Sequence, residues 1–128
     1  MRQASHVLRI DTPGAGLHEI TGEVAAGRHR LLRHTSASLL IQENADPDVA
    51  RDLQDYFAAL APESAAYRHQ AEGADDMPAH LRAALTQVQL SIPLVAGRLA
   101  LGTWQGIYLF EHRRRPHRRE VVLHLIGD

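Results

Sequence analysis

The stretch VQLSIPLVAGRLALGTWQGIYLFEHRRRPHRREVVLHLIG, residues 88–127, decides the fold of this chain. It contains four segments rich in aliphatic and β-branched residues, at 88–95, 98–104, 106–113 and 119–127. Short turns that contain Gly or Pro join these segments. Consecutive strands with such tight connections favour an antiparallel sheet.

The first third of the chain adds two expected strands. Residues 3–12, QASHVLRIDT, alternate loosely between polar and apolar side chains and are predicted as a strand. Residues 30–43, RLLRHTSASLLIQE, are apolar and β-branched at both ends, which indicates a long strand with an irregular middle. Between them, residues 17–27 are predicted as a short helix that ends at Gly27.

Two helices are expected in the middle of the chain. In the segment 44–63, Asp46 is a good N-cap and Pro47 suits the first helical position. Apolar residues then recur every three or four positions, at Val49, Leu53, Phe57 and Leu60. A second helix is predicted from Met77–Pro78 through Leu85. The predicted fold class is therefore α+β and rich in β structure.

The composition is that of an ordinary globular chain. The 128 residues, 45% hydrophobic and 23% charged, fit a single domain that covers 1–128. A net charge of -1 argues against a general affinity for nucleic acid or anionic membranes. Cysteine is absent, which excludes disulfides and thiolate metal sites. No segment has the pattern of a signal peptide or a membrane span, so we expect a cytoplasmic protein.

The first stretch with candidate site residues is HTSAS, residues 34–38. Along a strand, alternation places His34, Ser36 and Ser38 on one face and Thr35 on the other. A histidine beside two hydroxyl groups suits anion binding or proton transfer. A strand edge with small polar residues explains the same pattern, so this stretch alone leaves both interpretations open.

The second stretch is YRHQAEGADDMPAHLRAAL, residues 67–85. It contains two histidines and three carboxylates: His69, Glu72, Asp75, Asp76 and His80. Imidazole and carboxylate groups are ligands that divalent cations take, and Gly73 lets the chain turn sharply between them. Alternatively, Asp76 caps the second helix and Asp75 favours its positive end. In that interpretation the stretch is only a solvated helix start.

The third stretch is GTWQGIYLFEHR, residues 102–113. Its two glycines suit a bulge or a close backbone approach. Trp104, the only tryptophan, is suited either to stacking on a heteroaromatic ring or to the core. Glu111 and Arg113 share one strand face and His112 lies on the other. The basic cluster RRRPHRR that follows fits either a phosphate-binding patch or a solvated hairpin tip.

Three blocks of the sequence, HTSASLLIQENADPDV, HQAEGADDMPAHL and GTWQGIYLFEHR, resemble the signature blocks of the YjbQ-like family in order and spacing. That family is also known as the "secondary thiamine-phosphate synthase enzyme" family, and the resemblance spans residues 8–127. It implies a compact α+β domain, rich in β structure, in which mostly antiparallel sheets form a sandwich-like arrangement with two or three helices packed on them. It also implies a homotrimer, which fits a small domain whose open sheet edges need cover.

The resemblance also assigns candidate roles. The family's polar signature maps onto His34, Thr35, Ser36, Asn44, Asp46, His69, Glu72, Asp75, Asp76, His80, Gln105, Glu111, His112 and Arg113. From this signature and the residue chemistry we predict catalytic groups at His34, Glu72, Asp75 and Glu111. Substrate-binding groups are predicted at Thr35, Ser36, Asn44, Trp104, Gln105 and Arg113. Ligands for a divalent metal (Zn²⁺, Mn²⁺ or Mg²⁺) are predicted at His69, His80 and His112, with His34 in reserve.

The activity that the resemblance implies is a thiamine phosphate synthase reaction on small phosphorylated substrates. An aminopyrimidine methyl diphosphate is joined to a thiazole phosphate, and diphosphate is released. Carboxylate-held metal and arginine forks suit the neutralisation of that leaving group. A site rich in histidine also fits a metal-dependent hydrolase or lyase acting on a small phosphorylated or heterocyclic metabolite. A third class is a non-catalytic trimer that binds a metal or a metabolite.

Overall fold

The computed structural model describes residues 1–24 and 29–127, and this part of the chain contains a four-stranded and a three-stranded antiparallel sheet, a two-stranded hairpin and two helices. In chain order, the elements are β1 (Arg2–Thr12), β2 (Gly16–Glu19), β3 (His29–Leu32), β4 (Ala37–Glu43), α1 (Pro47–Leu60), α2 (Asp76–Leu85), β5 (Gln89–Ser91), β6 (Leu94–Val95), β7 (Arg98–Leu99), β8 (Gln105–Glu111) and β9 (His117–Gly127). The larger sheet has the strand order β1-β9-β3-β5, and the smaller has the order β2-β8-β4. A short β6–β7 hairpin stands apart from both sheets. The predicted α+β fold, rich in β structure, is confirmed.

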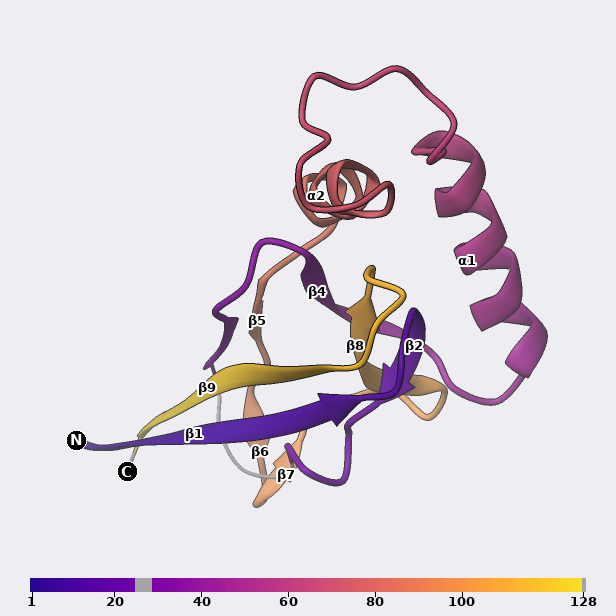
Figure 1. Cartoon of the computed structure of the whole chain (residues 1–128). Helices are drawn as coiled ribbons and strands as arrows, with labels where there is room; N and C mark the ends of the chain where they lie inside the picture. Colours follow the sequence, from indigo (N-terminus) through magenta and orange to yellow (C-terminus); the bar gives the residue numbers. More distant parts are fainter. Residues whose placement is uncertain (25–28, 128) are drawn as a thin grey trace.

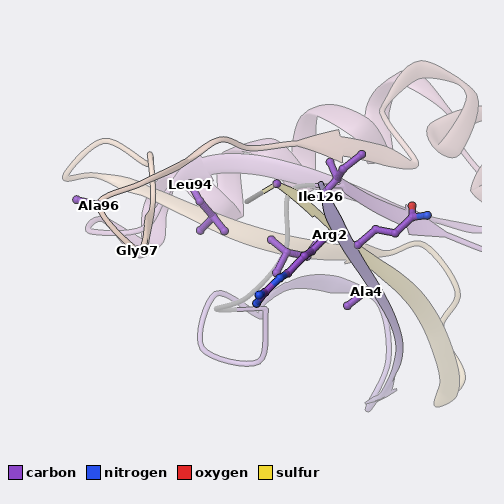
Figure 2. A pocket seen from close by; sticks show the side chains of 9 residues that line it. Arg2, Ala4, Leu94, Ala96, Gly97 and Ile126 are labelled. Atoms are coloured by element: carbon purple, nitrogen blue, oxygen red, sulfur yellow. The ribbon is translucent and has the colours of Figure 1, made fainter.

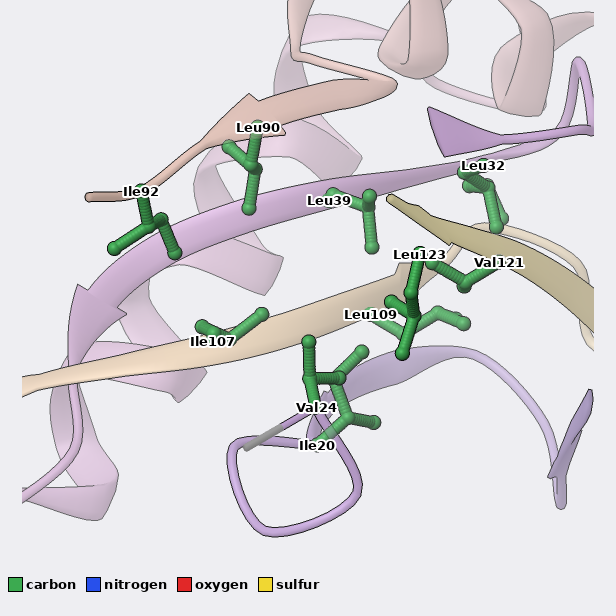
Figure 3. Packing of buried hydrophobic residues seen from close by; sticks show 11 residues of the cluster. Ile20, Val24, Leu32, Leu39, Leu90, Ile92, Ile107, Leu109, Val121 and Leu123 are labelled. Carbon is green, nitrogen blue, oxygen red and sulfur yellow. The ribbon is translucent and has the colours of Figure 1, made fainter. Parts of the chain in front are cut away.

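The core lies between the two sheets (Figure 3). Leu32, Val121 and Leu123 come from the larger sheet, and Leu39 and Leu109 from the smaller one. These side chains are at most 7% exposed. Such packed apolar contacts supply most of the stability of a small domain. The sheets therefore form the two layers of a sandwich.

Strand β8 is buried on both faces because the helices cover the outer side of its sheet (Figure 1). Ile107 and Leu109 face the core, whereas Phe110 faces α1 and meets the ring of Phe57 at 5.5 Å in an edge-on contact. Helix α2 contacts β4 of the same sheet. This arrangement brings the end of β8 close to the start of α2, where the candidate site lies.

The helix predicted at residues 17–27 is wrong in the described part of that segment. Gly16–Glu19 is strand β2, because Leu17 and Glu19 pair with Phe110 and Tyr108 of β8. A turn follows through Val24, and residues 25–28 lie outside the described residues. Pairing with a central strand outweighs weak helical periodicity in so short a segment.

The other predicted elements are confirmed only in part. Of residues 98–104 only Arg98–Leu99 is a strand, and the four late segments do not form one antiparallel sheet, because β5 and β9 belong to the larger sheet and β8 to the smaller. The long strand of residues 30–43 is interrupted at its irregular middle, so β3 joins the larger sheet and β4 the smaller. Helix α1 starts at Pro47, and the side chain of Asp46 accepts a hydrogen bond from the amide of Asp48, as an N-cap does. Neither helix of the described chain has the length and apolarity that crossing a bilayer requires.

Candidate functional site

Four metal-ligand side chains meet where the loop after α1 runs into α2. His69, Glu72, Asp76 and His80 each offer one ligand atom, and these atoms lie within 4.8 Å of one another. The Nε2 atoms of His69 and His80 lie 2.6 Å and 3.0 Å from the same Asp76 oxygen, Oδ2. We call these four residues the His–Asp cluster. Its inner member, Asp76, is 2% exposed, whereas the side chains of His69 and Glu72 are 41% and 66% exposed.

The prediction that Asp76 caps α2 is wrong. The capping position is held by Asp75, whose side chain makes no capping hydrogen bond, and Asp76 is the first helical residue. Asp76 and His80 are one helical turn apart, so they share a face of α2. The Asp76 carboxylate therefore points at His69 and His80 instead of at the helix amides.

The ring of His80 is oriented as in a metal ligand. Its Nδ1 lies 2.9 Å from the carbonyl oxygen of Thr35, which can only accept a hydrogen bond, so Nδ1 carries a proton. A neutral ring then turns its Nε2 lone pair toward the Asp76 carboxylate, a repulsive contact unless the ring is doubly protonated or a cation lies between them. A backbone carbonyl that fixes the tautomer in this way is typical of histidines that bind metals. These residues therefore fit a divalent metal.

Arg113 holds the loop carboxylates in place. Its Nε donates to Asp75 at 3.0 Å, its Nη1 donates to Asp76, and its Nη2 donates to the Glu72 carbonyl at 2.9 Å. Burial raises the pKa of Asp75, but hydrogen bonds from the Arg114 amide and from Arg113 outweigh this effect and hold the pKa below its ordinary value. Burial likewise opposes hydrogen bonds and nearby positive charges at Asp76, and its net pKa is also lowered. Both carboxyl groups are therefore ionised at neutral pH.

A pocket of about 650 Å³ adjoins the His–Asp cluster. Its wall is formed by Ala71, Glu72, Gly73, Asp75, Arg113, Arg114 and Arg115. Arg113 is engaged with carboxylates, but Arg114 is exposed, with a side chain at 3.2 Å from Glu63, and Arg115 is exposed as well. The chemistry of this wall suits a phosphate group. We call this space the arginine pocket.

Another cavity, of about 600 Å³, lies at the open end of the sandwich (Figure 2). Leu94, Leu125 and Ile126 line it, with Arg2 as the one charged residue among the described lining residues. It lacks the groups that acid–base or metal chemistry needs. We therefore place the candidate site at the His–Asp cluster.

Two of the predicted site residues lie inside the protein and have structural partners. Glu111 is fully buried, and its carboxylate accepts hydrogen bonds from Thr12 and Arg119. Burial raises its pKa, but the hydrogen bonds from Arg119 and Thr12 outweigh this effect and lower it. Ser36 is 9% exposed and accepts a hydrogen bond from Arg119. These contacts tie β8, β9 and the HTSAS segment together behind the cluster.

His112, predicted as a metal ligand, does not belong to the His–Asp cluster. It is 1% exposed, and its Nε2 lies 2.9 Å from the hydroxyl oxygen of Ser38. Burial, with a smaller contribution from the positive charge of Arg82, lowers the pKa of His112 to about 3. The ring is therefore neutral near physiological pH. Its Nδ1 has no partner among the described residues.

His34 and Thr35 flank the cluster. The Nε2 of His34 accepts a hydrogen bond from the amide of Glu120 at 2.8 Å, and burial, aided by the charge of Arg119, lowers its pKa. Thr35 contributes its backbone carbonyl to His80, a contact that side-chain chemistry alone does not predict.

The remaining predicted residues lie at the other end of β8. Asn44 donates its backbone amide to the Trp104 carbonyl at 2.9 Å, and the side chain of Gln105 accepts from the Gly102 amide. Trp104 is 63% exposed, which excludes the alternative of a core tryptophan. The structure thus brings His69, Glu72, Asp75, His80 and Arg113 together and separates them from these three. The signal for Asp76, which one of the two interpretations of this stretch made a helix cap, was present in its spacing of four from His80.

Comparison with known proteins identifies the family. The sequence matches the family described as UPF0047 protein YjbQ-like over residues 6–128. UPF0047 protein sll1880 of Synechocystis sp. is 52% identical, in an alignment covering 99% of this chain and 94% of that protein. UPF0047 protein YjbQ of Escherichia coli O157:H7 is 44% identical, with coverages of 94% and 96%. The crystal structure of the conserved hypothetical protein TT1486 from Thermus thermophilus has a TM-score of 0.81 at 37% identity, covering 91% of this chain and 97% of that one.

Fold and site together define a small sandwich protein, rich in β structure, with a candidate metal-binding cluster at one end. The chain belongs to the YjbQ-like UPF0047 family. The names of the relatives above state no reaction.

Proposed function

We propose that this protein is a divalent-metal enzyme that acts on a small phosphorylated metabolite. The observation that carries the proposal is the convergence of two imidazole nitrogens on one buried carboxylate oxygen beside an arginine-lined pocket. His69, Asp76 and His80 would hold the metal, and Glu72 lies within reach as a further ligand. Two nitrogen and one or two oxygen ligands suit Zn²⁺, Mn²⁺ or Fe²⁺ better than Mg²⁺, which prefers oxygen ligands.

The chain's own groups have distinct tasks in this proposal. When bound, the metal supplies Lewis-acid stabilisation of developing negative charge. The Thr35 carbonyl orients His80, and Arg113 fixes the Asp76 carboxylate. Arg114 and Arg115 bind phosphate oxygens at the pocket wall. Glu72, the most exposed of the ligand groups, accepts or delivers a proton when it is not coordinated.

The first candidate reaction is the thiamine phosphate synthase reaction that the family resemblance implies. The bond between the pyrimidine methylene carbon and diphosphate breaks, and diphosphate leaves with the electron pair. The thiazole nitrogen then forms the new C–N bond. The arginine pocket supports this reaction, because it offers positive charge where the leaving group develops. Within one chain Trp104 is not placed to stack the pyrimidine, since it lies beyond the opposite end of β8.

The second candidate reaction is metal-dependent hydrolysis of a phosphorylated metabolite. The exposed side chains of His69 and Glu72 favour it, because water reaches the cluster directly. Both reactions share charge stabilisation at a departing phosphate or diphosphate. The homotrimer and the cytoplasmic location expected from the sequence complete this proposal.

Metal analysis and diphosphate release test the proposal. Protein without a His-tag is loaded with Zn²⁺, Mn²⁺ or Mg²⁺, and release from aminopyrimidine methyl diphosphate is measured with and without thiazole phosphate. Release that needs thiazole phosphate supports the synthase, and release without it supports the hydrolase. The His80→Ala variant should lose both bound metal and diphosphate release. The His124→Ala variant, changed on the outer face of the larger sheet, should retain both. Stoichiometric metal binding without release of phosphate or diphosphate from the phosphorylated substrates would indicate a metal-binding protein instead of an enzyme.

A further inference from the structure

A cavity of about 230 Å³ lies on the helix-covered side of the smaller sheet and shares no lining residue with the His–Asp cluster or the arginine pocket. Both α1 and α2 contribute to it, and both cover this side of the sheet in Figure 1. At about 30 Å³ per water molecule in the liquid, the space is large enough for seven or eight waters or for a small organic molecule such as benzoate. The lining residues that matter for its chemistry are Asp55, Phe57, Ala58, Arg82, Phe110 and Glu111.

Arg82 lines this cavity and forms no ion pair with a carboxylate of the described chain. Its Nη2 donates to the carbonyl oxygen of Ala61 at 2.9 Å, just past the end of α1, which accounts for one of its nitrogens. Its Nε is buried and has no partner among the described residues. Burial lowers the pKa of Arg82 and outweighs the opposing charges of Glu63 and Asp75. A charged donor that is shielded from water and lacks an acceptor attracts an anion.

His112 provides a second donor without a partner. Its Nε2 lies 2.9 Å from the hydroxyl oxygen of Ser38, which is fully buried and has no other acceptor in the part of the chain that the structure describes. The hydroxyl therefore donates to Nε2. Because the ring is neutral, its proton lies on Nδ1, and this nitrogen has no acceptor among the described side chains and backbone groups. The ring centroid of His112 lies 4.3 Å from that of Phe110, so this second donor lies next to the cavity wall.

The rest of the wall limits which anion fits. Phe57 and Phe110 offer aromatic surface for an apolar group. Asp55 is exposed and lines the cavity, and Glu111 lines it as well, although its carboxylate is already held in an ion pair inside the sandwich. Negative charge on the wall disfavours a dianion such as phosphate. A single carboxylate, in contrast, is balanced by the guanidinium of Arg82.

We propose that this cavity is a second binding site, which takes a small monocarboxylate with an apolar body. The carboxylate pairs with Arg82 and accepts from the Nδ1 hydrogen of His112, and the body packs against Phe57 and Phe110. Because the Nε of Arg82 is shielded in the structure, the guanidinium turns into the cavity as the carboxylate enters. Arg82 and His80 are two residues apart, which is about 200° around a helix, so this site and the His–Asp cluster lie on different sides of α2. The inference therefore goes beyond the proposed function and needs no metal.

Titration calorimetry of the full-length, metal-free protein tests the ligand chemistry. Benzoate is the probe, and benzamide is its matched control, because it has the same shape without the charge. We expect saturable binding of benzoate and binding of benzamide that is weaker by at least about tenfold. Inorganic phosphate, which suits the arginine pocket, should not displace benzoate. Absence of benzoate binding, equal binding of benzamide, or displacement of benzoate by phosphate would each overturn the inference.

Two matched variants of α1 test the position of the site. Ala58 and Ala59 are both exposed, but only Ala58 lines the cavity. Ala58→Phe should fill the cavity and abolish benzoate binding, whereas Ala59→Phe should bind benzoate as the wild type does. Both variants should keep the metal affinity of the wild type, since neither residue touches the His–Asp cluster. Equal benzoate affinity in the two variants would place the ligand elsewhere and would refute the inference.

Replacement of Arg82 tests the charge that holds the carboxylate. Arg82→Gln should weaken benzoate binding by at least about tenfold, because it removes the charge-assisted hydrogen bonds. Arg51→Gln is the control, because Arg51 is an exposed arginine of α1 that pairs with Asp48 on the surface. A folded Arg82→Gln protein with the benzoate affinity of the wild type would overturn the inference. If Arg82→Gln does not fold, the comparison of Ala58→Phe with Ala59→Phe decides.

Discussion

Replacement of Asp76 by Asn tests the cluster, because a helix cap would tolerate this change, whereas the charged centre of the cluster would lose stability. Asn caps helices as well as Asp does, so a capping role predicts almost no loss. In the structure, however, the carboxylate is 2% exposed, accepts a hydrogen bond from Arg113 and lies 2.6 Å and 3.0 Å from the ring nitrogens of His69 and His80. Hydrogen bonds to charged groups contribute about 1.5–3 kcal/mol each, and they are not additive. We therefore expect Asp76→Asn to lower the free energy of unfolding by about 2–4 kcal/mol.

The assay is thermal unfolding of the metal-free protein, measured by differential scanning calorimetry. For a domain of this size, that loss corresponds to a decrease in Tm of roughly 10 °C. Asp48→Asn is the matched control, because Asp48 is 71% exposed and pairs with Arg51 on the surface. It should change the free energy of unfolding by less than about 0.5 kcal/mol. If the Tm values of both variants are close to that of the wild type, Asp76 is not the charge centre of the cluster.

Three further predictions follow from individual contacts. The pKa of His112 is about 3 in the folded state and ordinarily 6.5, so its contribution to the free energy of unfolding is complete above pH 6.5 and is lost as the pH falls toward 3. In urea unfolding, the free energy of unfolding of His112→Phe should therefore fall less steeply with decreasing pH than that of the wild type, by up to about 1.4 kcal/mol per pH unit. Equal slopes for the two proteins would contradict the buried neutral histidine. Arg113→Lys keeps the charge but loses the fork to Asp75 and Asp76, so calorimetry should show weaker Zn²⁺ binding, whereas equal affinity would make the fork dispensable. Gly73→Ala should lower the free energy of unfolding by about 1–2 kcal/mol, because φ is +104° and the new Cβ would lie 3.2 Å from the Asp75 side chain. Gly22→Ala is the control, because there is open space around Gly22. Equal Tm values for the two variants would refute the strain at Gly73.

Local patterns in the sequence were sufficient for the elements whose signals are local. The cap at Asp46 with Pro47 defines the start of α1, and the alternation of residues 119–127 defines a strand. The short segment at 17–19 was mispredicted, because its partner, β8, lies about ninety residues further along the chain. Such pairing leaves no trace in the local periodicity.

The candidate site shows the same division. Residue chemistry and spacing singled out the loop of His69, Glu72 and His80 as a place for a divalent metal. They could not distinguish a buried charge centre from a helix cap at Asp76, because both begin a helix and differ only in where the carboxylate points. They also placed His112 among the ligands, although the fold buries it beside Ser38.

The sequence by itself determined the β-rich class, the two helices and the chemical groups of the site, since each of these depends on neighbours within a few residues. The tertiary structure alone decided which groups meet. Pairing of β8 with both β2 and β4, and packing of α2 on β4, carried Thr35, Arg113 and His80 to one place and left Trp104 at the far end. The physical reason is that these contacts join residues 33 to 78 positions apart, and the register of a sheet and the face of a packed helix are set by burial of the whole core.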